Sequence, residues 1–354
     1  MQESFKPLKK KNSAIVAAEN KEYVRKRKDG EITSMKTKFT KLDKCLMGGV
    51  ELNTITCISA LSGAGKSTLS KCFRDSFVDL NKDQHFKQYI FNFEMISHQQ
   101  IARSIVSEAE ISIKELYSVD TPLSEQTYDA LDRYYTGLAE RDIDFIDVAG
   151  SAKMICNSLL YYWKTECKAE NKTLVYELDH VKLVKNRDGQ KERDMIEELM
   201  VGLVDVKKKI QEAGGNSLGI VLSQMNRDIR GVDRVKNAEM HRPDASCLFG
   251  ASAIEQCCDH ILFSHMPAKL GITAYTTDRL PVKYKIDDTE YMLPYFELVK
   301  QRSGESDLTI PMWNKLKFFD FDEMDSSIFQ QLRDDFDTDD SQIPKVNFKQ
   351  QKLF

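Results

Sequence analysis

The residues best suited to chemistry form a loop of small side chains between a strand-like run and a helical segment. The strand-like run covers 54–61 and the helical segment covers 69–80. Backbone N–H groups of such a loop can surround phosphate oxygens, and the following helix points its positive end at the same anion. This order is typical of a Walker A loop and predicts a site for nucleotide phosphates. The loop residues are Ala60, Leu61, Ser62, Gly63, Ala64, Gly65, Lys66, Ser67 and Thr68.

Three side chains have expected partners in such a site. Lys66 is expected to lie against the β- and γ-phosphates, and the Ser67 hydroxyl is expected to bind Mg²⁺. Asp179 ends the apolar run that begins at residue 173. It is predicted to be the Walker B aspartate, which holds the metal through a water molecule. The predicted cofactors are therefore ATP and Mg²⁺.

Hydrolysis also requires a group that orients the attacking water. Many P-loop motors carry a glutamate directly after the Walker B aspartate, but His180 stands there in this chain. Glu94 ends the strand-like run 89–94, and ligands of α/β sheets lie beyond the carboxyl ends of strands. Glu94 is therefore predicted to be the catalytic base. Gln224 ends a third apolar run and is predicted to contact the γ-phosphate as a switch.

The elements that must position these residues alternate along the chain. Strand-like apolar runs are separated by stretches long enough for helices, which predicts an α/β fold with a mostly parallel, twisted sheet flanked by helices. Right-handed crossovers are expected between the parallel strands. The predicted strands are 54–61, 88–94, 142–148, 174–181, 218–224, 260–263, 295–299 and 308–313.

Composition excludes several classes of protein. Of the 354 residues, 41% are hydrophobic and 30% are charged, and no apolar run approaches the roughly 20 residues that span a bilayer. The basic first 30 residues lack the apolar centre of a signal peptide, so a cytoplasmic protein without membrane contact is expected. Three regions are predicted: a basic arm or linker helix at 1–33, an ATPase domain at 34–322, and a flexible acidic tail at 323–354.

In order and spacing, these residues resemble the carboxy-terminal motor domain of DnaB-type replicative helicases, in a short, phage-like version. His180 stands where that family usually has tyrosine. The resemblance implies a RecA-like P-loop fold and an ATP hydrolase that unwinds DNA at a replication fork. The segments that carry it are Thr37–Asp43 with Gly48 and Gly49, the Walker A loop, Phe93–Met95, Asp179–Leu183, Ser223–Arg227, Gly250–Gln256 with Asp259, and Lys300–Gly304.

The same resemblance implies a homo-hexameric ring with ATP bound between subunits. Lys300 and Arg302 would then reach the γ-phosphate of the neighbouring subunit's nucleotide. Single-stranded DNA would pass through the channel, where basic loops grip phosphates without reading sequence. The candidate DNA-binding residues are Lys185, Arg187 and Lys191 in one loop, and Arg227, Arg230, Arg234 and Lys236 in a second loop that also contains Arg242.

Several partners are left open. The family's amino-terminal domain, which contacts primase, has only the basic arm in its place, so contacts with primase and with a loader are not fixed by the sequence. The arm is either a linker helix that packs on the next subunit or a disordered segment. Gln350–Phe354 resembles the Q-x-x-L-F peptide that bacterial sliding clamps bind.

Two other functions fit part of the pattern. A RecA-type recombinase, or another DNA-stimulated ATPase that does not unwind, would share Lys66, Glu94, Asp179 and Gln224. A nucleotide-gated adaptor would bind ATP and barely hydrolyse it. The segment 253–256 and the Lys300/Arg302 pair favour the helicase.

Overall fold

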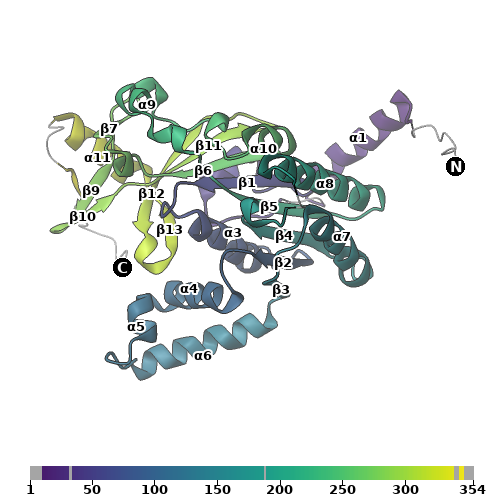
Figure 1. Cartoon of the computed structure of the whole chain (residues 1–354), viewed down its shortest axis with the longest axis horizontal. Coiled ribbons are helices and arrows are strands. Elements are labelled where there is room, and N and C mark those ends of the chain that lie inside the picture. The colour runs from purple at the N-terminus through teal and green to yellow at the C-terminus, as the bar shows by residue number, and fades with distance from the viewer. Residues whose placement is uncertain (1–9, 32–33, 187–188, 339–342, 347–354) are drawn as a thin grey trace.

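A nine-stranded sheet runs through the described part of the chain (Figure 1). This computed structural model describes residues 10–31, 34–186, 189–338 and 343–346. The strand order is β13-β12-β11-β6-β1-β5-β4-β2-β3. The strands are β1 (Thr54–Ala60), β2 (Phe86–Asn92), β3 (Ile143–Ile146), β4 (Thr173–Asp179), β5 (Ser217–Gln224), β6 (His260–His265), β11 (Tyr295–Gln301), β12 (Leu308–Lys315) and β13 (Asp320–Glu323).

The sheet has two edges that matter for function. Strands β1 to β6 pair in parallel, so their carboxyl ends meet at one edge, here called the carboxyl edge. Strand β11 pairs antiparallel with β6, and its last residue, Gln301, lies opposite His260, the first residue of β6. The end of β11 therefore lies at the other edge, here called the amino edge. The predicted α/β fold with a mostly parallel sheet is confirmed.

Helices cover this sheet. Helix α3 packs against β1, β5 and β6, whereas α8 packs against β5, α7 and α10. The group formed by α4, α5 and α6 extends away from the sheet (Figure 1). None of the described helices has the length and apolar character needed to cross a membrane. The helices are α1 (Ser13–Lys28), α2 (Thr40–Cys45), α3 (Lys66–Leu80), α4 (Ser97–Ala109), α5 (Ile113–Tyr117), α6 (Glu125–Glu140), α7 (Ala152–Tyr162), α8 (Glu192–Glu212), α9 (Val232–Lys236), α10 (Ala251–Cys257) and α11 (Ser326–Thr338).

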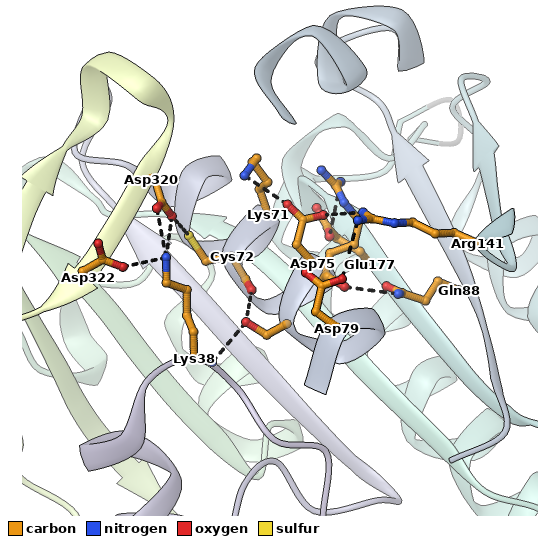
Figure 2. A network of polar contacts seen from close by, with 12 residues as sticks. Lys38, Lys71, Cys72, Asp75, Asp79, Gln88, Arg141, Glu177, Asp320 and Asp322 are labelled. Carbon is orange, nitrogen blue, oxygen red and sulfur yellow. Dashed lines mark hydrogen bonds and ion pairs between the residues drawn. The ribbon is translucent and has the colours of Figure 1, made fainter. Parts of the chain in front are cut away.

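A polar network fixes the position of α3, the helix that follows the Walker A loop (Figure 2). The Lys38 ammonium lies 2.9 Å from the Asp320 carboxylate and 2.7 Å from that of Asp322, both on β13. Farther along, Arg141 beyond the end of α6 contacts Asp75 of α3 at 3.3 Å. Because these side chains are partly buried, removing one partner would leave a poorly solvated charge. Cys72 of α3 donates to Asp320 at 3.1 Å, so the network ties α3 to β13 on one side and to Arg141 on the other.

The acidic carboxy-terminal segment packs more closely than its composition predicts. In α11, Leu332 and Phe336 are buried, and Ile328 lies one turn earlier on the same face. Fully burying such a side chain stabilises the fold by roughly 1.5–3 kcal/mol. Strand β14 (Lys345–Val346) also pairs with β9 (Lys283–Ile286). The sequence indicates a short helix at the start of 323–354, and α11 is that helix, with an apolar face at helical spacing beside its acidic residues. The flexibility of the tail that follows stays a prediction.

A second hydrophobic cluster lies under this segment. It contains Tyr284, Leu293, Tyr295 and Trp313 together with Leu332 of α11. Short strands that were not predicted from the sequence build it, namely β7 (Ala274–Tyr275), β8 (Leu280–Pro281), β9 and β10 (Thr289–Met292). The boundaries proposed for the three regions of the chain stay predictions. On the amino-terminal side, α1 buries none of its residues and projects from the body (Figure 1).

Candidate nucleotide-binding site

The loop between β1 and α3 adopts the shape expected of a phosphate cradle. Gly63 has a φ of 71° and Gly65 a φ of 88°, in the left-handed region that favours glycine. A Cβ atom on Gly65 would clash with the ring of Phe321, so the loop is also closely packed from behind. Helix α3 begins at Lys66, directly after this turn. The predicted order of strand, glycine loop and helix is confirmed.

A cavity of about 330 Å³ opens above this loop at the carboxyl edge. It collects residues from β1, the loop, α3, α4, the ends of β2, β4 and β5, and the segment after β12. Ala64 does not line it, because this residue is buried and its carbonyl oxygen accepts a hydrogen bond from Ser264 at 2.6 Å. The lining residues are Ala60, Leu61, Ser62, Gly63, Gly65, Lys66, Ser67, Thr68, Glu94, Arg103, His180, Gln224, Leu316 and Phe319.

Lys66 is the electrostatic centre of the cavity. Its Nζ lies 3.3 Å from Asp179 Oδ1 and 3.6 Å from Glu94 Oε2. The Ser67 hydroxyl donates to Asp179 Oδ2 at 3.2 Å. An ammonium beside open space, flanked by loop amides and a helix amino terminus, can neutralise a polyphosphate. The fold thus brings together four residues from three separate segments of the sequence.

The oxygen atoms beside Lys66 fit a magnesium ion. Asp179 is only 1% exposed, and its Oδ1 has no hydrogen-bond partner among the described atoms. A hydroxyl and a carboxylate are hard oxygen ligands, and Mg²⁺ usually takes one or two carboxylates and completes its shell with water and phosphates. Within the described ranges, no group of three or more His, Cys, Asp or Glu side chains could hold a metal by itself. The donor set therefore suits a metal that arrives with a nucleotide.

Glu94 is free to act in the cavity. Its side chain is 50% exposed and is not required to cap α4. Asp147 performs that role, because it accepts hydrogen bonds from the Ser97 backbone at 3.0 Å and from the Ser97 hydroxyl at 2.8 Å. Glu94 is therefore not needed as a cap of α4. Gln224 reaches the same cavity from the end of β5.

His180 lies directly behind Glu94. Its Nε2 is 3.6 Å from Glu94 Oε2, and its Nδ1 accepts a hydrogen bond from the Lys182 backbone at 3.3 Å. Burial lowers the pKa of His180 below its ordinary value, and the Lys66 charge acts in the same direction. Both effects favour the neutral imidazole.

Sequence reasoning missed several residues of the site. Arg103 of α4 lines the cavity, and its guanidinium lies 4.8 Å from the ring centre of Phe319. Burial lowers the pKa of Arg103. Lys269 lies outside the cavity lining, but its ammonium donates to the Gly63 carbonyl oxygen. No motif marks these positions, because only the tertiary fold brings α4 and the segment after β12 to the loop.

Lys300 and Arg302 lie away from this cavity, at the amino edge. Arg302 contacts the Asp259 carboxylate at 3.1 Å and donates to the Gln256 carbonyl oxygen at 3.0 Å. The Lys300 ammonium donates to the carbonyl oxygen of Glu255. Both cations therefore rest on the last turn of α10, where unpaired helix carbonyls attract positive charge. They do not reach the cavity of their own chain.

The candidate DNA-binding residues divide into two groups. Lys185, Lys191, Arg227, Arg230 and Lys236 are exposed, whereas Arg187 lies outside the described residues. Arg234 does not fit a DNA-facing role in this structure, because its side chain is 12% exposed and contacts Asp244 and two backbone carbonyls. Arg242 likewise pairs with the fully buried Glu297 at 2.9 Å. These two arginines hold the second loop in place.

Comparison with known proteins identifies the family of this chain. The family described as "DnaB-like helicase C terminal domain" matches residues 34–323. A solved structure described as an ATPase domain has a TM-score of 0.70 and 18% identity, and the match covers 89% of this chain and all of that one. A structure described as a DnaB-like replicative helicase and its interactions with primase has a TM-score of 0.68 and 17% identity, over 90% of this chain and 68% of that one. Comparison with curated proteins gives no match.

The family match spans most of the chain and includes every residue that converges on the cavity. The two solved structures share the fold at low identity. A helicase is favoured over a recombinase and over an adaptor that does not turn over ATP. The chain belongs to the DnaB-like helicase C-terminal domain family and is an ATP-dependent enzyme of the replicative helicase type.

Proposed function

We propose that this chain hydrolyses ATP in the cavity around Lys66 and uses the energy to move along single-stranded DNA as a homo-hexameric ring. The observation that carries the proposal is the position of the Lys66 ammonium. It lies between the Asp179 carboxylate at 3.3 Å and the Glu94 carboxylate at 3.6 Å, beside a glycine loop shaped for phosphate. A triphosphate in the cavity would draw the ammonium away from these acids.

Five side chains at the carboxyl edge have a role in this proposal. Lys66 balances charge on the β- and γ-phosphates, while Ser67 and Asp179 hold Mg²⁺, which would neutralise phosphate oxygens when bound. Glu94 takes a proton from the attacking water as the water oxygen bonds to the γ-phosphorus and the bond to the bridging oxygen breaks. Gln224 donates to the γ-phosphate and releases it after hydrolysis.

The second half of the site is supplied by another subunit. Lys300 and Arg302 lie at the amino edge, opposite the cavity, so they cannot complete the site of their own chain. In a head-to-tail assembly the amino edge of one subunit faces the carboxyl edge of the next, and such contacts can close into a ring. The two cations would then exchange helix carbonyls for γ-phosphate oxygens and stabilise the transition state.

DNA contact is assigned to the exposed members of the two loops. One loop leaves the end of β4 and the other leaves the end of β5, so both start at the carboxyl edge. Arg227 and Arg230 lie on the short turn 227–230, which follows Gln224 closely in the chain. A change in the contact between Gln224 and the γ-phosphate could therefore move these two arginines against the DNA. Backbone phosphates are the expected contacts, without sequence preference.

The candidate protein partners are a primase, a loader and a sliding clamp. A primase is proposed as a partner, because a structure of similar fold describes a helicase and its interactions with primase. A loader stays a hypothesis from the family resemblance. The clamp-binding peptide at Gln350–Phe354 lies outside the described residues.

A direct experiment is to measure assembly and unwinding together. Mass photometry with Mg·ATP and a single-stranded oligonucleotide should give six-subunit particles, and the same sample should displace one strand of a forked duplex. Particles of a single subunit under these conditions would contradict the ring. ATP hydrolysis with strand exchange and no displacement would instead indicate a recombinase.

A further inference from the structure

His180 has two polar contacts that point in opposite directions. Its Nδ1 accepts from the Lys182 backbone at 3.3 Å, so the hydrogen of the neutral ring is on Nε2. Nε2 is the nitrogen that faces Glu94, at 3.6 Å from Oε2. This separation is slightly longer than a hydrogen bond, and catalytic contacts commonly tighten once substrate is bound. The ring is therefore oriented to donate to Glu94.

Through Nδ1, the imidazole is hydrogen-bonded to the turn that leads into the first candidate DNA loop, the loop with Lys185 and Lys191. His180 caps the short turn 181–183, and the chain then continues to Lys185 and the exposed residues of that loop. Because the ring is only 9% exposed, it has little room to turn independently of its neighbours. Movement of the turn would therefore move the group that faces Glu94.

The same turn also touches the second candidate loop. The Lys182 ammonium lies 4.4 Å from the ring centre of Phe249, which ends that loop. The Phe249 backbone donates to the Gln224 carbonyl oxygen at 3.0 Å, and its own carbonyl accepts from the Ser223 hydroxyl at 3.3 Å. Both loops thus meet within two residues of His180.

We infer that His180 is a positioning residue that orients Glu94 for proton transfer and makes this orientation depend on DNA in the two loops. The inference rests on the proposed function, since it requires Glu94 to be the base. His180 acts through Glu94 and is not itself catalytic. It takes the place directly after the Walker B aspartate, where other P-loop motors carry the base.

The test compares three substitutions of His180 in the full-length chain. His180→Phe keeps a planar ring and removes both nitrogens. His180→Asn can still cap the turn through its side-chain oxygen but is too short to reach Glu94. His180→Gln has an amide that can extend to Glu94. The control is His85→Phe, because His85 is exposed at the start of β2, far from the cavity.

Steady-state ATPase is measured with and without single-stranded DNA, and melting temperature reports folding. His180→Phe and His180→Asn should lower kcat on the order of 10- to 100-fold, a typical cost of misplacing a catalytic group, with little change in KM. Their stimulation by DNA should largely disappear. His180→Gln should recover a substantial part of both, and His85→Phe should match the parent chain. If His180→Phe folds poorly, the Asn and Gln pair decides alone.

Two further results separate this inference from the proposed function. In a Glu94→Gln background, His180→Asn should produce no additional loss, because both changes act on one group. If Glu94→Gln hydrolyses ATP normally, the assignment of Glu94 falls and the inference falls with it. If Glu94→Gln is inactive while His180→Asn keeps its kcat and DNA stimulation, only the role of His180 is refuted.

Discussion

The two edges of the parallel sheet hold their charged side chains in different ways. At the carboxyl edge, Lys66 and Glu94 line an open cavity, and the Lys66 ammonium lies 3.6 Å from the carboxylate of Glu94 and 3.3 Å from that of the buried Asp179. At the amino edge, Lys300 and Arg302 lie on helix carbonyls, and Arg302 also pairs with Asp259. The first edge is organised to receive a ligand. The second presents cations that could leave their carbonyl partners for a stronger anion such as a phosphate.

Under the proposed function, this difference would give one subunit a complete binding site and an incomplete catalytic one. A triphosphate can be bound by groups of one chain, because loop, lysine and metal ligands all lie at one edge. Transition-state charge requires further cations, and those of this chain lie at the wrong edge for its own nucleotide. The comparison predicts that variants at the carboxyl edge fail within a subunit, whereas variants at the amino edge fail only in the assembly.

The largest effect is expected from Lys66→Ala. It removes the only ammonium that lines the cavity in the described residues, and it leaves the buried Asp179 carboxylate without its cation. Loss of one preorganised charge at a phosphate typically costs about 10²- to 10³-fold in rate, and the loss of ATP binding adds to this, so ATPase and unwinding should become undetectable. ATP should also no longer raise the melting temperature. Lys82→Ala, an exposed lysine just beyond α3, is the control.

Glu94→Gln should separate binding from hydrolysis within the same edge. The amide has the same size but cannot accept the proton of the water, so kcat should fall by about 10²- to 10⁴-fold. ATP should still raise the melting temperature, since Lys66 and the loop are unchanged. Glu140→Gln, at the exposed end of α6, should behave like the parent chain. A variant with normal turnover would show that another group activates water.

The amino edge is tested with Arg302→Ala. Loss of a cation supplied in trans should lower the ATPase of the assembly by about 10³-fold, while nucleotide binding persists. Mixing this variant with Lys66→Ala should recover part of the ATPase activity, because some boundaries would pair an intact cavity with an intact Arg302. Arg133→Ala, on the exposed face of α6, is the control. Full activity of Arg302→Ala alone would exclude the trans assignment.

The carboxyl edge was the more predictable part of the molecule. Its residues follow strands, and the rule that ligands lie beyond strand carboxyl ends brought Glu94, Asp179 and Gln224 together without a structure. The P-loop residue pattern added Lys66 and Ser67. Because these are local patterns linked by one topological rule, the sequence was sufficient to predict which residues lie together at this edge.

What could not be predicted depends on side-chain partners far away in the chain. Arg103 and Phe319 come from segments over 200 residues apart, and neither lies in a recognisable pattern. The sequence predicted Arg227 and Arg234 equally as DNA-binding residues. In the fold, however, Arg227 is exposed and Arg234 pairs with Asp244. The acidic composition of α11 gave no indication that one face of this helix packs on the body and buries Leu332. In each case the deciding contact is tertiary.

The smallest effect concerns the loops that leave the carboxyl edge. Changing Arg227 and Arg230 together to Ala should weaken binding to single-stranded DNA uniformly across sequences, and the slope of log affinity against log salt should fall by about 0.7 for each DNA phosphate that the variant no longer neutralises. Nucleotide binding should not change. Arg234→Ala is the matched comparison from the same loop: because this guanidinium holds Asp244, the variant should lower the melting temperature while leaving the salt slope nearly unchanged. Fluorescence anisotropy at several salt concentrations measures both variants. An Arg234 variant with the larger change in slope would mean that the loop opens on DNA and presents the side chain that this structure holds inside.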